Sequence, residues 1–149
     1  MFGFGKKYNK EADILGKILH EQIFSAMKEN ESLASRRLQT PFFAGYFFGF
    51  VKVGLTNSLN VPAGKTKDYY EYICDGIYPK TLYKTITELV NFTQNTREIS
   101  EADYIKGTKV GFYDGTNFIN WSEPSKRANL KPYLLDKKLD YDEETLEEE

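Results

Sequence analysis

Cysteine and histidine are almost absent from this sequence, whose 149 residues include one of each, Cys74 and His20. A single cysteine excludes a disulfide within the chain and any zinc site built from several cysteines. The spacings His-Glu-x-x-His and Glu-x-x-His, which place metal ligands on one helix face, are missing as well. We therefore predict no metal site and a reducing, cytoplasmic location.

A long apolar run is also missing. The most apolar stretch, residues 41–55, is 15 residues long and contains Lys52, whereas a bilayer-spanning helix needs about 20 apolar residues. The first ten residues carry their apolar side chains before their positive charges, the reverse of a secretory signal peptide. We predict no transmembrane segment, and the one membrane contact considered is a weak one at the surface, through Phe2 and Phe4.

Motifs for cofactor binding and catalysis are incomplete. Gly64, Lys65 and Thr66 match the end of a phosphate-binding P-loop, but Leu59 stands where the motif needs its first glycine. Cys74 has apolar neighbours in the sequence, which is typical of a small buried side chain rather than of a nucleophile. The sequence therefore predicts no cofactor and no identifiable catalytic residue. An enzyme would have to use carboxylates that carry no local motif.

Charge is unevenly distributed although the net charge is only −2. Residues 133–149 contain eight acids and two bases, so they carry −6, while the other 14 acids and 18 bases leave residues 1–132 at +4. We predict that residues 1–132 form one domain and that residues 133–149 form a solvated acidic tail, with association of the tail and the basic body as the alternative. Because the lysines and arginines are scattered, we predict no nucleic-acid partner.

Helical patterns cover most of the sequence. Residues 9–29 repeat apolar side chains at three- and four-residue spacings, which predicts an amphipathic helix. Thr40 and Pro41 form a strong helix start, and the helix they open, residues 41–59, is aromatic on nearly all sides and so belongs in the centre of a packed structure. Another helix is expected from Pro79. The sequence predicts a mainly α fold, a single-domain bundle of five or six helices around this central helix.

Glycine recurs at four-residue spacing in two segments of the chain. These glycines are Gly45 and Gly49, then Gly107, Gly111 and Gly115. Because glycine costs about 1 kcal/mol relative to alanine inside a helix, the repeats indicate that two helix backbones pack closely. An alternative is a β-hairpin at residues 108–121, since Asp114 and the glycine after it lie between two short aromatic and β-branched runs. We favour the helix.

Aromatic residues are the best candidates for binding, because they offer apolar area with a polar end at interfaces and pocket rims. The candidates are Tyr46, Phe47, Phe50, Tyr69, Tyr70 and Tyr72. The leading hypothesis is a non-catalytic helical interaction module that forms a dimer with itself or binds another protein. The alternatives are a binder of a lipid or other apolar small molecule, in a cavity lined by the central helix, and an enzyme with unrecognised carboxylates.

Overall fold

The computed structural model describes residues 7–77 and 101–142 of the chain. These residues form helices and helical turns with no β-strand, so the predicted mainly α fold is confirmed. Three predictions concern residues outside these ranges: the membrane contact of Phe2 and Phe4, the helix from Pro79, and the acidic residues 143–149 of the tail.

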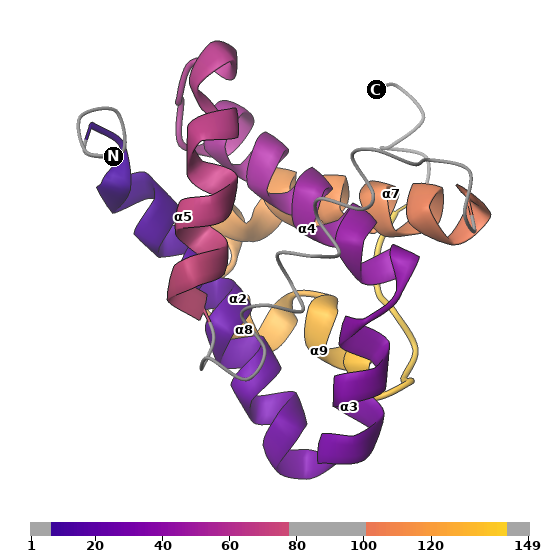
Figure 1. The fold of residues 1–149 in the computed structure, drawn as a ribbon. Helices are drawn as coiled ribbons and strands as arrows, with labels where there is room; N and C mark the ends of the chain where they lie inside the picture. The colour runs from indigo at the N-terminus through magenta and orange to yellow at the C-terminus, as the bar shows by residue number, and fades with distance from the viewer. Residues whose placement is uncertain (1–6, 78–100, 143–149) are drawn as a thin grey trace.

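Two pairs of helices organise the fold (Figure 1). The α-helices are α2 (Asn9–Glu29), α3 (Glu31–Leu38), α4 (Pro41–Val53), α5 (Lys67–Ile77), α7 (Glu101–Asn117), α8 (Pro124–Arg127) and α9 (Leu130–Leu134). Short turns add a π-helix (Gly54–Ser58) and 3-10 helices (Ala63–Lys65, Phe118–Asn120). Helix α5 packs against α2, and α4 lies along α7, so that segments far apart in the sequence form each pair.

Helix α2 is amphipathic, as its sequence pattern predicts. Its buried residues are Ala12, Leu15, Ile18, Leu19, Gln22, Ile23 and Ala26. These positions form one stripe, and α3, α5, α8 and α9 all pack against the helix. Gln22 is the polar exception, and its side-chain oxygen accepts a hydrogen bond from the backbone N–H of Lys131 at 2.9 Å. The long helix therefore joins the first and last parts of the described chain.

Helix α4 begins where the sequence predicts. The hydroxyl oxygen of Thr40 accepts from the N–H of Phe43 at 3.3 Å, and Pro41 occupies the first turn, where its missing N–H costs nothing. The aromatic side chains of this helix form the centre of the core. The α-helical part ends at Val53, and the remainder of the predicted range 41–59 contains a π-helical turn.

Helix α7 is parallel to α4, and the β-hairpin alternative for residues 108–121 is not adopted. Among the facing residues, the residue numbers increase in the same direction along both helices, so the two helices are parallel. These facing pairs are Gly107 with Phe42, Gly111 with Tyr46, and Gly115 with Phe50. The start of α7 therefore lies beside the start of α4.

Glycine allows the backbones of α4 and α7 to touch. A Cβ atom on Gly111 would lie 2.5 Å from the carbonyl oxygen of Tyr46, and one on Gly49 would lie 2.6 Å from the carbonyl oxygen of Thr108. Real Cβ atoms do not approach a carbonyl so closely, so a larger residue would push the helices apart. The partner backbone crowds all five glycines: Gly45, Gly49, Gly107, Gly111 and Gly115.

The body of the fold continues past residue 132, where the sequence analysis placed the start of a solvated tail. Helix α9 carries Leu134 into the core, where its side chain is 0 % exposed. Residues 136–142, which we call the strap, follow without regular secondary structure. The strap reaches α7, since the ring of Tyr141 lies 6.3 Å from that of Tyr113. The first ten residues of the predicted tail are therefore part of the packed structure.

Candidate functional site

Most of the aromatic residues that the sequence singles out lie in the core. Tyr46, Phe47, Phe50 and Tyr69 are each 0 % exposed. Tyr46 stacks on Phe50 with ring centroids 5.7 Å apart, and the Tyr69 hydroxyl accepts from the backbone N–H of Tyr8 at 2.8 Å. These side chains fill the interior of one chain. A partner could reach them only if the fold opened.

Tyr70 and Tyr72, on α5, lie nearer to solvent. Tyr70 is half-buried, and burial raises the pKa of its hydroxyl to about 12. Tyr72 is 37 % exposed and donates a hydrogen bond to Asp13 on α2 at 2.9 Å. It lines a groove of about 590 Å³ between α2 and α5. The other lining residues are Ala12, Asp13, Gly16, Lys17, His20 and Ile73.

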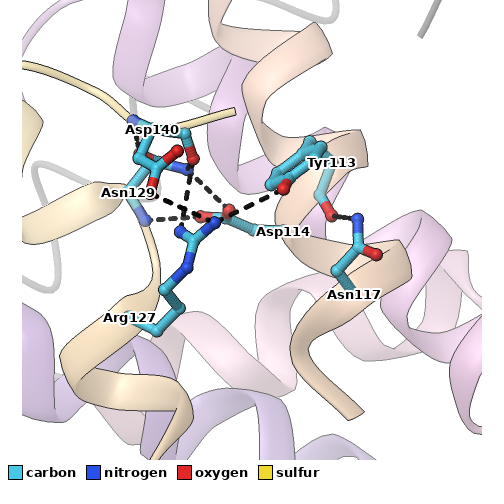
Figure 2. Close-up of polar contacts among 6 residues, drawn as sticks. All are labelled: Tyr113, Asp114, Asn117, Arg127, Asn129 and Asp140. Atoms are coloured by element: carbon cyan, nitrogen blue, oxygen red, sulfur yellow. Dashed lines mark hydrogen bonds and ion pairs between the residues drawn. The ribbon is translucent and has the colours of Figure 1, made fainter. Parts of the chain in front are cut away.

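A buried carboxylate on α7 connects three parts of the fold. Asp114 is 0 % exposed, and its two oxygens accept three hydrogen bonds. The hydroxyl of Tyr46, on α4, donates at 2.6 Å. The backbone N–H and the side-chain amide of Asn129, between α8 and α9, donate at 2.7 and 2.8 Å. Figure 2 shows the carboxylate pointing from α7 toward this segment.

Arg127 and Asp140 extend this polar network to the strap (Figure 2). The guanidinium group of Arg127 donates to the carbonyl oxygen of Asp140 at 3.2 Å and to the hydroxyl of Tyr113 at 3.3 Å. It also lies over the ring of Trp121, 4.5 Å from the ring centroid. The network thus runs from the core at Asp114 to an exposed segment of chain.

Burial raises the pKa of Asp114 to about 6, while hydrogen bonds from Tyr46 and Asn129 and the charge of Arg127 act in the opposite direction. A carboxyl group with such a pKa could act as a general acid near neutral pH. A general acid must reach its substrate, however, and Asp114 has no exposed surface. The arrangement makes Asp114 a structural link between helices.

A groove with an excess of positive charge lies where α3, the start of α4, the start of α7, α9 and the strap meet. Its volume is about 570 Å³. Its charged lining residues are Arg37, Lys106, Lys137 and Lys138, with Asp103 and Asp136. Aromatic and apolar side chains complete it: Phe42, Tyr133, Leu139 and Tyr141. We call this the basic groove, because four cations face two acids.

Arg37 is held in place at the edge of the basic groove. Its Nε donates to the carbonyl oxygen of Tyr133 at 2.6 Å, and its guanidinium carbon lies 4.1 Å from the centroid of the Tyr133 ring. That ring stacks in turn on Phe42, with centroids 3.9 Å apart. The one ion pair of Arg37 in the described structure joins it to the exposed Asp136 at 3.8 Å and is weak. Its remaining N–H donors can therefore meet an anion.

The lysines add charge that the fold itself does not neutralise. Within the described ranges, Lys106 and Lys138 form no ion pair. Lys137 has one weak pair, with Glu29 at 3.8 Å between two exposed side chains. The cations come from α3, α7 and the strap, so the positive charge is spread around the groove. Such a distribution suits a ligand that carries several separate negative charges.

Neither the basic groove nor the Asp114 network is predicted from the sequence. The hairpin alternative for residues 108–121 makes Asp114 a turn residue. The sequence does contain a helical signal, because small or apolar residues recur at three- and four-residue spacings and Asp114 is the one acid among them. These positions are 107, 110, 111, 114, 115 and 118, and the structure buries all of them. An acid on an apolar stripe indicates a buried partner. No local pattern indicates the groove, whose lining comes from distant segments.

Further findings limit the chemistry of the site. Within residues 7–77 and 101–142, no three histidine, cysteine, aspartate or glutamate side chains are grouped so that they could hold a metal ion. None of the helices in these ranges combines the length and the apolar character needed to cross a bilayer. Comparison with protein-family models, with curated proteins and with solved structures finds no match. The function must be inferred from the chemistry of the chain itself.

Proposed function

We propose that the protein is a non-catalytic helical interaction module and that its basic groove binds an acidic segment of a second protein chain. The observation that carries this proposal is the ordered guanidinium group of Arg37, which lies on an aromatic stack and has donors to spare. Arginine in such a position recognises carboxylates with little loss of side-chain freedom. A cytoplasmic location is part of the proposal and rests on the single cysteine.

An acidic segment fits the groove for reasons of charge and shape. Arg37, Lys106 and Lys138 come from three different elements, so one small anion would meet only part of the positive charge. A peptide with several glutamates or aspartates can face all of them at once. Leu139 and Tyr141 add apolar area for the stems of its side chains.

The other hypotheses have less support from the described residues. The strongest candidate for a catalytic acid, Asp114, is sealed in the core. The aromatic side chains of the central helix, which an apolar ligand would need, pack against one another and against the rest of the chain. Binding of a protein partner requires neither exposure of Asp114 nor opening of the aromatic core.

The direct test is a fluorescence-anisotropy titration with a labelled peptide of eight glutamates. We expect saturable binding that weakens with salt, because the charges are exposed. The double variant Lys106→Glu, Lys138→Glu should bind about tenfold more weakly, with each substitution contributing about 0.7 kcal/mol. The matched control is Lys65→Glu, an exposed lysine that does not line the groove. Equal affinity of the double variant and the control would contradict the proposal.

A second version of the titration tests whether the chain's own acidic end competes with the peptide for the basic groove. Residues 143–149 contain five glutamates, and these are changed to glutamine in the otherwise full chain before the titration is repeated. Absence of binding to both chains would rule out the basic groove as an acidic-peptide site. Native mass spectrometry on the same samples reports whether the second chain is another copy of this protein. A retained adduct of small-molecule mass would instead support the apolar-ligand hypothesis.

A further inference from the structure

The strap forms one wall of the basic groove. Its residues Lys138, Leu139 and Tyr141 line the groove, together with Asp136 and Lys137 at the start of the strap. The groove therefore has its described shape only while the strap lies against the rest of the fold. The attachment of the strap therefore determines whether both walls of the groove are in place when a ligand binds.

Asn129 attaches the strap to the core through its side chain. Its amide oxygen accepts from the backbone N–H of Asp140 at 2.7 Å, and its amide nitrogen donates to the carbonyl oxygen of Asp140 at 3.1 Å. The ion pair between the Asp140 carboxylate and Arg127, at 3.4 Å, is a weaker attachment because that carboxylate is 83 % exposed. The side chain of Asn129 thus bonds the backbone of the strap on both sides of one residue.

Asp114 determines which way the Asn129 amide points. The second hydrogen of the amide nitrogen is donated to Asp114 at 2.8 Å, so both donors and the acceptor of this side chain are used. If the amide were turned over, its oxygen would face the Asp114 carboxylate, and the amide nitrogen would face the N–H of Asp140. Both contacts would be repulsive. The buried carboxylate therefore holds Asn129 in the one orientation that can receive the strap.

We propose that Asp114 and Asn129 form a latch that holds the strap against the rest of the fold and thereby completes the basic groove. This inference rests on the proposed function for its link to binding, while the latch itself rests on hydrogen bonds alone. Asn129 is 1 % exposed and Asp114 is 0 % exposed. Asp114 acts as a positioning residue, because its hydrogen bonds reach the strap through Asn129.

Amide hydrogen exchange at residue 140, followed by nuclear magnetic resonance, measures the latch without any ligand. The backbone N–H of Asp140 is bonded to Asn129, so its protection factor reports the ratio of closed to released strap. We expect this factor, corrected for intrinsic exchange, to be about tenfold lower in Asp114→Asn, because an amide at position 114 cannot accept from Tyr46 and from both N–H groups of Asn129 as the carboxylate does. An unchanged factor in this variant would overturn the latch.

A matched pair of strap variants tests the link to the groove. Asp140→Pro removes the backbone N–H that donates to the side-chain oxygen of Asn129 and changes no core residue. Asp140→Ala keeps that N–H and removes only the exposed carboxylate. The eight-glutamate peptide should bind Asp140→Pro about tenfold more weakly than Asp140→Ala, as expected for loss of one groove wall. Equal affinities would overturn the control of the groove by the latch. If the peptide binds no chain at all, the proposed function fails, and the exchange data still decide the latch.

Discussion

Helix α7 is attached to the rest of the fold by two different kinds of contact. Its glycines bring its backbone into direct contact with that of α4. Its Asp114 carboxylate accepts hydrogen bonds from Asn129 of the C-terminal segment and from Tyr46 of α4. The first contact depends on available space, and the second depends on charge and hydrogen bonding.

The two contacts differ in what can change them. The glycine contact has no group that titrates and no room for an added atom, so it holds α4 and α7 together as one unit under all ordinary conditions. The Asp114 contact contains a carboxylate with a pKa of about 6 and a partner on an irregular segment. A reversible change in this molecule is therefore expected at the strap, and the basic groove lies beside it.

The largest effect should come from filling the glycine contact. Gly111→Leu would place side-chain atoms against the carbonyl oxygen of Tyr46 and the N–H of Phe50. We expect the free energy of unfolding to fall by about 3 kcal/mol or more, measured by urea denaturation followed by circular dichroism. Gly64→Leu is the control, since a Cβ atom there meets nothing within 4 Å. Similar midpoints for the two variants would show that the helices do not touch as described.

Removing the carboxylate of the polar contact should have the next largest effect. Asp114→Ala leaves the hydroxyl of Tyr46 and two N–H groups of Asn129 without an acceptor in the core, which should cost about 2 to 3 kcal/mol of unfolding free energy. Asp13 is a matched control because it also accepts a hydrogen bond from a tyrosine, Tyr72, but at an exposed position. Asp13→Ala should cost less than about 0.5 kcal/mol. Equal losses would argue against a buried role for Asp114.

The two contacts should also differ in pH dependence. Because folding raises the pKa of Asp114 from 3.8 to about 6, the folded chain binds the proton more tightly than the unfolded chain. This group therefore makes the fold more stable as the pH falls and less stable as the pH rises through 6. Between about pH 5 and about pH 7.5 the stability of the original chain relative to Asp114→Asn should drop by about 1.4 kcal/mol. A constant difference in urea denaturation would contradict the raised pKa.

The smallest effect on stability is expected in the groove itself. Lys106→Gln removes a charge that has no ion pair among the described residues, so the unfolding free energy should change by less than about 0.5 kcal/mol. The same variant should weaken binding of the eight-glutamate peptide by a few fold, because a charge facing the ligand is lost. A large loss of stability would mean that Lys106 serves the fold rather than a ligand.

The glycine contact of α7 could be predicted from the sequence, whereas the partner of its polar contact could not. Glycine at every fourth position is a local pattern, and its cost inside a helix points to close packing whatever the partner is. Asp114 could have been recognised as an acid on a buried stripe, but its partner Asn129 follows 15 residues later in an irregular segment. The basic groove combines Arg37, Lys106 and Lys138, and nothing in the sequence around each of them indicates that they share a surface.

The tyrosine-rich segment shows a second limit of sequence patterns. Tyr69 and Tyr72 are three residues apart on α5, yet one is fully buried and the other is 37 % exposed. Composition identifies both as suited to an interface. Their positions relative to α2, which composition does not specify, determine which of the two side chains is exposed.

Chemical shifts of the full-length, isotope-labelled chain are the most direct test of whether the basic groove is the binding surface. The eight-glutamate peptide is added stepwise while the amide signals are followed. We expect the shifted signals to belong to the end of α3, the start of α7, α9 and the strap. Shifts confined to the groove between α2 and α5, or no shifts at saturating peptide, would contradict it.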